Sequence, residues 1–240
     1  MKGNLKFLNK ALLIEEAGKR ILVASDLHIG YFESLRKRGQ LVPGGGEELK
    51  EIKKLIEENE GIDKLIVLGD LKHEFGKIYS EERRQFGELR EFLNERKCEL
   101  VLVKGNHDVL VPFVRELLGI KIVEHFIFGK YAFLHGDKEV KEAYGEKIKY
   151  WIVGHGHPAV RVSDKYKEEK FKCFLSGKFK GKEVIILPSF FSGNLGTDPR
   201  EFEMSMAWKF DLGKFEVRVV GDNGEVMKFG KLKDIGGLRE

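Results

Sequence analysis

Short apolar runs, each followed by polar residues, are the main pattern along the first half of the chain. The clearest run, residues 65–68, consists of four branched apolar residues that lead directly into Gly69 and Asp70. Such a run predicts a strand buried on both faces, and Gly69 permits a sharp turn that leaves a carboxylate at the strand's carboxyl end. The same layout recurs around Asp26, Asn106, His135 and His155. Ligands of open α/β sheets bind at the carboxyl ends of strands, so we expect these residues to form one site.

Strands and helices are predicted to alternate as far as residue 103. Strands are expected at residues 21–24, 65–68 and 100–103, and apolar residues at helical spacing predict helices over 47–60 and from Ser80 onward. This order favours parallel strands with right-handed crossovers. A hairpin with arms at 5–15 and 20–25 is expected before them, and a short helix near 114–118 after them.

In the second half of the chain, short apolar runs separated by turn residues predict strands joined by short turns. We expect them at residues 120–128, 131–134, 150–153, 159–162, 171–175, 184–187, 206–210, 215–220 and 226–229. This half should be mostly antiparallel. Both halves fit a single domain over residues 1–240, of the α/β class, built as a β-sandwich of mixed sheets with helices on its outer faces.

Composition indicates a globular chain. Of its 240 residues, 42% are hydrophobic and 34% are charged, which is enough apolar surface for a core. No apolar run approaches the length of a membrane span, and the N-terminus lacks the layout of a signal peptide, so a cytoplasmic protein without a membrane partner is expected. Cys98 and Cys173 lie far apart and are predicted to be reduced, packed thiols.

The charge balance is mild. A net charge of +4 permits contact with phosphates but is not typical of a protein that coats nucleic acid. Only two Gln and one Thr accompany abundant Lys and Glu, a usage that resembles thermophile proteins.

The histidines are concentrated at the predicted strand ends. Of seven histidines, six occupy these clusters: His28, His73, His107, His135, His155 and His157. The seventh, His125, lies in an apolar run and is interpreted as a strand residue. Carboxylates neutralise and bridge cations, whereas imidazole selects transition ions, so this mixture indicates a binuclear transition-metal site.

The polar clusters also resemble, in order, the five motifs of the calcineurin-like metallophosphoesterases. They are Asp26-x-His28, Gly69-Asp70, Gly105-Asn106-His107-Asp108, His135 and Gly154-His155-Gly156-His157. The sequence of residues 69–75, together with Pro-Ser-Phe at 188–190, resembles the corresponding sequences of small phosphoesterases related to the SbcD-type repair nucleases. The resemblance implies the four-layer αββα form of the sandwich.

The resemblance further implies the ligands of two divalent ions, foremost Mn, with Fe, Ni and Zn as alternatives. Asp26, His28 and His157 would hold one ion; Asn106, His135 and His155 would hold the other, and Asp70 would bridge both. His107 would face the scissile phosphate as the general acid or as an electrostatic clamp, oriented by Asp108, while neighbouring ions make hydroxide available for attack on phosphorus.

Three further residues are candidates for substrate binding. His73 either contacts the substrate phosphate or hydrogen-bonds to a ligand. Phe190 and Phe191 lie in a Gly-containing loop, where aromatic rings either stack on a base or close the end of the core.

The expected function is hydrolysis of phosphodiesters, in a nucleotide or at nucleic-acid ends. A phosphomonoesterase using the same site is the alternative, and a non-catalytic scaffold is disfavoured because every motif position is retained. The residues after His157 are too few for the DNA-capping domain of the repair nucleases. We therefore expect a small diester, a nucleotide or a single-stranded end as substrate, rather than a duplex interior.

Overall fold

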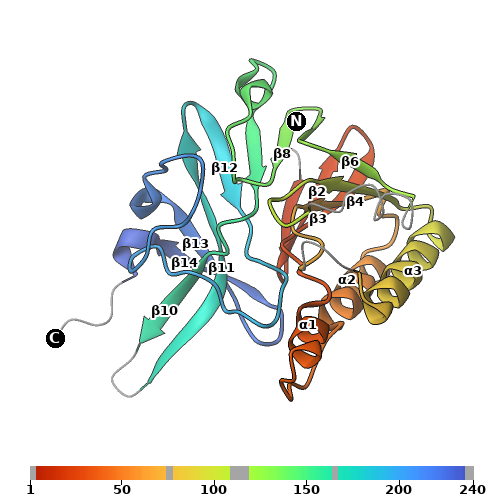
Figure 1. The fold of residues 1–240 in the computed structure, drawn as a ribbon. Coiled ribbons are helices and arrows are strands. Elements are labelled where there is room, and N and C mark those ends of the chain that lie inside the picture. The colour runs from red at the N-terminus through yellow and green to blue at the C-terminus, as the bar shows by residue number, and fades with distance from the viewer. Residues whose placement is uncertain (1–3, 74–77, 109–118, 164–166, 236–240) are drawn as a thin grey trace.

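Two β-sheets packed face to face form the centre of the protein. The computed structural model describes residues 4–73, 78–108, 119–163 and 167–235 (Figure 1). The first sheet has its strands in chain order: β1 (Asn4–Leu8), β2 (Ala11–Glu16), β3 (Lys19–Ser25), β4 (Lys64–Leu68), β5 (Glu99–Val103) and β6 (Lys121–Val123). β1 to β3 are antiparallel neighbours, and β3 to β6 are parallel, as the alternating strand and helix pattern predicts.

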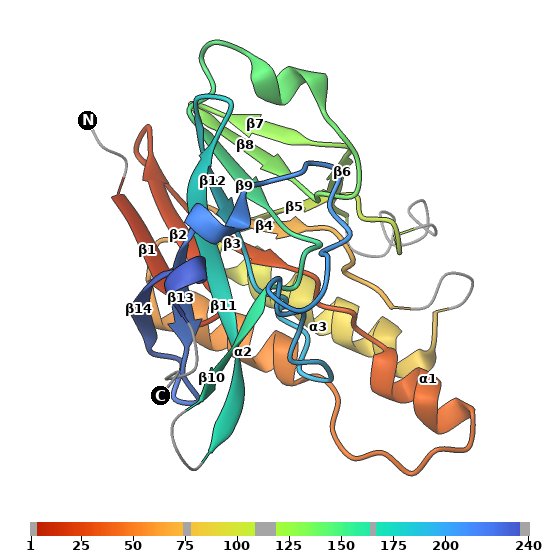
Figure 2. The ribbon, with the colours of Figure 1, turned by 90° about the vertical axis from the view of Figure 1, so that its left-hand side faces the viewer.

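The second sheet is built from the second half of the chain. Its order is β14 (Val226–Lys231), β13 (Glu216–Val220), β11 (Glu168–Phe179), β12 (Lys182–Ile186), β9 (Tyr150–Val153), β8 (Tyr131–Leu134) and β7 (Phe126–Phe128), while β10 (Ala159–Ser163) pairs with β11. β12, β9 and β8 are parallel neighbours, and the other pairs are antiparallel. β10 and the start of β11 extend beyond the sandwich as a hairpin (Figure 2).

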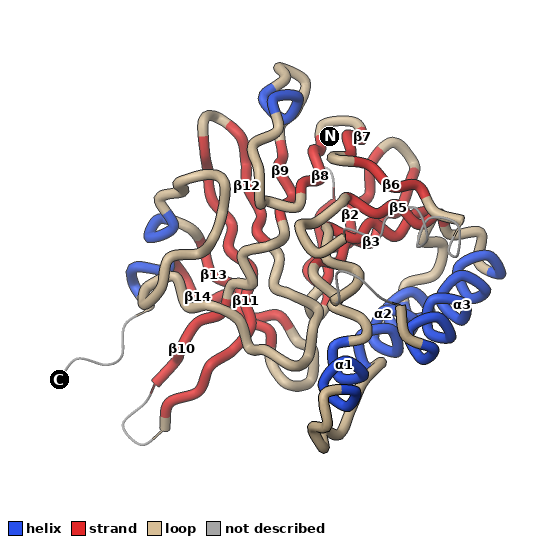
Figure 3. The backbone as a smooth tube through the Cα atoms, viewed as in Figure 1, coloured by secondary structure: helices blue, strands red, loops and turns tan. Residues whose placement is uncertain are grey.

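The described α-helices lie on the outer side of the first sheet (Figure 3). They are α1 (Tyr31–Lys37), α2 (Glu47–Glu58) and α3 (Ser80–Glu95). The outer face of the second sheet packs against loop residues such as Trp208 and Phe215 and against three 3-10 turns, Lys141–Tyr144, Leu212–Lys214 and Leu232–Asp234. The predicted α/β sandwich of mixed sheets is thus confirmed. Of the expected helices on both outer faces, the described residues place α-helices on the first sheet, and loops with 3-10 turns cover the second. None of the described helices is long and apolar enough to cross a membrane.

Alternation along the central strands fills both faces of the first sheet. On β4, Leu65 and Val67 pack toward the helices, whereas Ile66 and Leu68 pack between the two sheets. Successive side chains of a strand point to opposite faces, so a continuous apolar run is what a strand buried on both faces requires. Both faces of such a strand are covered by apolar side chains, so the polar residues that follow the strand lie at its carboxyl end.

Three expected elements differ from the structure. Residues 120–128 form two strands in different sheets, β6 and β7, so His125 lies in the crossing between sheets and not within a strand. The first hairpin arm, 5–15, is itself the β1–β2 hairpin. Residues 206–210 are irregular, because their apolar side chains cover the face of the second sheet instead of pairing at its edge. Apolar spacing does not distinguish these cases. The helix expected near 114–118 lies outside the described residues.

Packing of α3 on the first sheet depends on Phe86, which is fully buried. Truncation to alanine leaves a cavity, so Phe86→Ala should lower the free energy of unfolding by about 3–5 kcal/mol in denaturant titration. Phe229→Ala is the control, since Phe229 on β14 is 41% exposed and its loss should cost about 0.5 kcal/mol or less. Similar losses for the two variants would contradict the assigned packing.

Candidate metal centre

Strands from both sheets end at one place, and this brings the polar motifs together. The loop after β3 runs beside the loop after β4, where the His28 N–H donates to the Asp70 carbonyl at 2.9 Å and the Ile29 N–H donates to the Leu71 carbonyl at 3.0 Å. The loop after β9 reaches the same place, because the His155 N–H donates to Asp26 Oδ2 at 3.0 Å.

Five of the candidate ligands have left-handed backbone conformations. The φ angles are 52° for Asp26, 47° for His28, 48° for Asp70, 62° for His155 and 42° for His157. This conformation is unfavourable for residues with a Cβ and persists where the surrounding structure imposes it, often at functional sites. The backbone thus aims these side chains at a common point.

Glycines allow the loops to approach so closely. A Cβ on Gly154 would collide with Ser25 Oγ and would lie 2.8 Å from the Leu68 carbonyl oxygen, and a Cβ on Gly105 would collide with the Asp70 carboxylate. Neither position can accept a side chain without moving a motif loop.

One group of potential ligands consists of Asp26, His28 and His157. One donor atom from each lies within 4.8 Å of the others, and His157 Nε2 is 3.2 Å from Asp26 Oδ1. The other carboxylate oxygen, Oδ2, accepts hydrogen bonds from Ser25 and from the His155 N–H. His28 Nδ1 is buried and makes no hydrogen bond with any residue that the structure describes. This set of one carboxylate and two imidazoles fits a divalent transition ion.

A second group consists of Asp70, His135 and His155, with donor atoms again within 4.8 Å of one another. His135 Nδ1 donates a hydrogen bond to the Leu68 carbonyl oxygen at 2.9 Å, which leaves Nε2 available as a candidate ligand. Asn106 Oδ1 is 3.1 Å from that Nε2. The structure therefore brings together all three residues expected around the second ion.

Asp70 lies between the two groups. Its Oδ2 is 3.9 Å from His28 Nε2 and 3.7 Å from His135 Nε2, so one carboxylate oxygen faces ligands of both groups. This is the placement that a bridging carboxylate requires. The ligand set assigned from the sequence fits two ions, although its role in binding them stays a prediction.

The two buried carboxylates have opposite pKa shifts. Burial raises the pKa of Asp70 to about 6. The nearby His135 lowers this pKa, but by less than burial raises it. Burial would also raise the pKa of Asp26, but His157, His135 and His28 outweigh it and hold that pKa well below its usual range. Asp26 is therefore an anion in the form that binds cations.

Burial also sets the charge of the imidazoles. It lowers the pKa of His28 to about 3 and lowers that of His155, so both rings are neutral near pH 7. For His135, burial is outweighed by the Asp26 and Asp70 carboxylates, which raise its pKa. Neutral imidazole is the form that ligates a metal, and a bound ion would replace the proton on His135.

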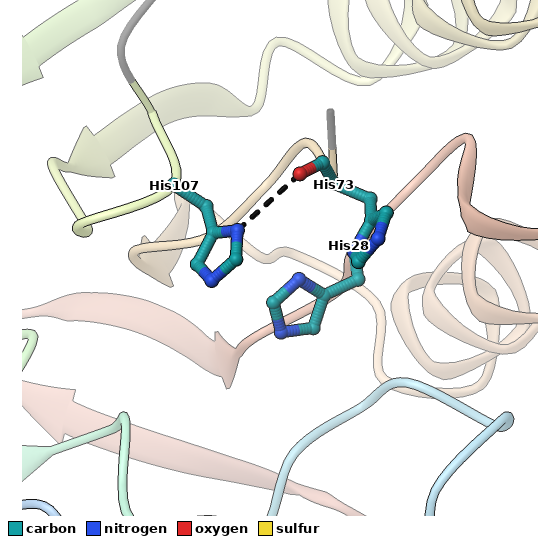
Figure 4. Close-up of side chains that lie close together, drawn as sticks. All are labelled: His28, His73 and His107. Carbon is teal, nitrogen blue, oxygen red and sulfur yellow. Dashed lines mark hydrogen bonds between the residues drawn. The ribbon is translucent and has the colours of Figure 1, made fainter. Parts of the chain in front are cut away.

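A third cluster, His28, His73 and His107, lies beside the first group and shares His28 with it (Figure 4). The His107 N–H donates to Asp70 Oδ1 at 2.9 Å, and His107 Nδ1 lies 3.3 Å from the His73 carbonyl oxygen. The centroids of the His28 and His107 rings are 5.2 Å apart. A cavity of about 230 Å³ opens here, lined by residues that include Asp70, Asn106 and His107.

Asp108 serves the backbone of the centre. Its Oδ2 accepts from the Gly105 N–H at 2.9 Å and the Asp70 N–H at 2.8 Å, and its Oδ1 accepts from the Leu71 N–H at 3.1 Å. Burial raises its pKa. These contacts make Asp108 a positioning residue that joins the loops after β4 and β5. The expectation that it orients His107 stays a prediction, and through these loops it would do so indirectly.

Phe190 and Phe191, for which the sequence left base stacking and closure of the core as alternatives, are both buried. Phe190 is 0% exposed and belongs to the core under the first sheet, so the prediction that its ring contacts substrate is wrong and the alternative, closure of the core, describes it. Phe191 is 6% exposed, and its ring lies 5.4 Å from His28 and 4.8 Å from Tyr31. It forms a wall behind His28.

Sequence reasoning missed Tyr31 and Lys172. The Tyr31 ring lies 4.7 Å from that of His73, at the border of the centre. Lys172 Nζ donates to the Ser189 carbonyl at 2.8 Å and to the Phe191 carbonyl, and burial lowers its pKa to about 7. Only the aromatic stretch after Gly30 could have suggested Tyr31, and no signal marks Lys172 among many lysines.

A sequence model of the family described as Calcineurin-like phosphoesterase matches residues 19–220. The chain belongs to this family. Its members are hydrolases that act on phosphate esters and are typically dependent on two metal ions, and this phosphoesterase carries His and Asp clusters suited to them.

Similarity to one solved structure, a nuclease, agrees with this fold. The Pseudomonas putida nuclease MPE is 18% identical with a TM-score of 0.63, and the match covers 95% of this chain and 100% of the nuclease. The Aquifex aeolicus protein of unknown function AQ665 is 20% identical with a TM-score of 0.38, over 57% of this chain and 78% of that protein. A search of curated proteins finds no significant match.

The role proposed for Asp70, a carboxylate that bridges two ions, can be tested by measuring the metal content of variants. Protein loaded with Mn should hold about two ions per chain, and Asp70→Ala should lose both because its carboxylate faces both groups. His157→Ala should weaken mainly one ion, and His125→Ala, which alters a histidine outside the centre, should retain both. Elemental analysis after dialysis measures these contents. Two ions retained by Asp70→Ala would refute the bridging assignment.

Proposed function

We propose that this phosphoesterase hydrolyses phosphodiesters, in nucleotides or at the ends of single-stranded nucleic acid. The observation that carries the proposal is the pair of ligand groups on either side of Asp70, with His107 beside them. When bound, two divalent ions would supply positive charge for the phosphate oxygens and lower the pKa of a water molecule toward neutrality. Mn suits the mixed carboxylate and imidazole donors, and Fe, Ni and Zn are the alternatives.

His107 is the residue proposed to protonate the leaving group. Its backbone N–H is fixed on Asp70, and its Nδ1 is placed against the His73 carbonyl, so the ring has a defined position beside the ligands. With Nδ1–H held by that carbonyl, Nε2 is the nitrogen that gives a proton to the departing alkoxide. His73 and His28 lie beside it, and His73 is proposed to contact the substrate phosphate.

Several features support a small or single-stranded substrate. The net charge is only +4, whereas duplex binding uses many Lys and Arg contacts along the phosphate backbone. The cavity over the centre is about 230 Å³, the scale of a small ester or one flexible strand end. The structural likeness to a nuclease adds nucleic-acid ends to the substrates worth testing. A phosphomonoesterase using the same residues remains the alternative.

A substrate panel separates these functions. With Mn present, we expect faster hydrolysis of a nitrophenyl diester and of a dinucleotide than of nitrophenyl phosphate, and faster release of nucleotides from single-stranded ends than cutting of closed circular duplex DNA. Initial rates at physiological salt measure the order. A preference for the monoester would favour the phosphatase, and efficient cutting of the closed circle would contradict the proposed substrate class.

His107→Asn should separate binding from chemistry. We expect both metal ions to remain, while turnover of a dinucleotide falls roughly 10²–10⁴-fold, the usual contribution of a general acid. The loss should be smaller for a nitrophenyl ester, whose leaving group needs no proton. His125→Asn is the matched control and should leave both rates unchanged. Equal losses for the two esters would argue against proton donation by His107.

A further inference from the structure

A second hollow, of about 480 Å³, lies within the loop that follows the metal motifs. It is lined entirely by residues between 199 and 213. Five of its lining residues are aromatic or thioether side chains: Phe202, Met204, Met206, Trp208 and Phe210. Large flat rings and polarizable sulfur atoms are the groups that pack well against another aromatic ring.

This hollow adjoins the metal centre. Glu203 and Met204 line both the hollow and the cavity over the ligands. Gly156, between two candidate ligands, is backed by the same segment: its Cβ position is 3.0 Å from Met206 Sδ and 3.2 Å from Met204 Sδ. The Ala207 N–H donates to the carbonyl of Gly136, which directly follows His135, at 2.9 Å. One wall of the hollow is therefore built on two metal motifs.

Buried contacts hold the loop in this shape. Asp198 is fully buried, and its carboxylate accepts from the Arg161 N–H at 2.8 Å and from the Arg200 N–H and Nε at 3.0 Å each. At the other end, Trp208 Nε1 donates to the Tyr144 hydroxyl at 3.0 Å. A preformed hollow needs little ordering when a ligand enters, which favours binding.

The charged residues that line the hollow are Arg200, Glu201, Glu203, Lys209 and Asp211, one more acidic than basic, a balance that suits an uncharged ring better than a second phosphate. Arg200 is paired with Asp198, and Asp211 is paired with Lys214 at 2.7 Å. Glu203, which lines both the hollow and the cavity over the ligands, can accept hydrogen bonds from the amino or imino groups of a base. At the rim, the Phe202 ring is 64% exposed, in contrast to the buried Phe190.

We propose that this hollow binds the nucleobase of the nucleoside attached to the scissile phosphate, with Phe202 as the stacking residue. The inference rests on the proposed function, because it places the phosphate over Asp70 and the base beyond the wall formed by Glu203 and Met204. It assigns to Phe202 the base contact that the sequence suggested for Phe190.

The kinetic test compares Phe202→Ala with the parent protein. Stacking on an aromatic side chain contributes about 1–3 kcal/mol per base, so KM for a dinucleotide should rise about 5- to 150-fold with little change in kcat. The same dinucleotide made with abasic sugars should show no such rise. Phe229→Ala, which removes an exposed aromatic ring outside both hollows, should behave as the parent. A similar rise with abasic sugars, or with Phe229→Ala, would overturn the proposal.

A binding test separates this inference from the proposed function. Calorimetry on Mn-loaded parent protein should show tighter binding of a nucleoside 5′-monophosphate than of ribose 5-phosphate, and Phe202→Ala should abolish the difference while retaining ribose 5-phosphate binding. Equal affinities in the parent would refute the base site even if diesters are hydrolysed. A base-dependent difference without hydrolysis of any diester would retain the base site and refute the proposed function.

Discussion

Two buried carboxylates, Asp26 and Asp70, impose the arrangement of the whole centre. Both follow central strands of the first sheet and are almost completely removed from solvent. Burying an anion is costly unless charges or hydrogen bonds compensate it, and here histidines and backbone N–H groups surround both side chains. The opposite pKa shifts of the two carboxylates show that compensation is more complete at Asp26. At Asp70, which lies between the two ligand groups, the anionic form is less well stabilised, and a nearby cation would stabilise it.

The sandwich supplies that compensation from both halves of the chain. The first sheet contributes the aspartates, Asn106 and His107, and the second sheet contributes His135, His155 and His157. The two sets meet only because the sheets pack with these strand ends together, and because Gly154 lets the loop after β9 lie directly on Ser25 and Leu68. Asp108 performs a similar task within the first sheet, since one carboxylate holds N–H groups from two loops. Neither ligand group could form in one half of the chain alone.

The loops after β12 pack against the centre at two places. Lys10 and Lys172 donate to the carbonyls of Phe190 and Ser189, and the Phe191 amide donates to the Asp26 carbonyl, so this segment is hydrogen-bonded to a candidate metal ligand. Farther along, residues 204–207 pack on the glycines beside His135 and His155 before the chain turns around the second hollow. These segments carry none of the candidate metal ligands, and under the proposed function they would contact the substrate.

The sequence by itself determined the central strands β3, β4 and β5 of the first sheet, the helices α2 and α3, and the candidate ligands from Asp26 to His157, because an apolar run and the residues after it are local features of the chain. It could not show that residues 120–128 cross between sheets, that residues 206–210 cover a sheet face, or that Phe190 is buried while Phe202 is exposed. It also could not reveal Tyr31 or Lys172 as neighbours of the centre. These facts depend on which distant segment lies opposite each residue. Apolar side chains look alike in a sequence whether they pair in a sheet, cover one or face a ligand, and only tertiary packing separates the three.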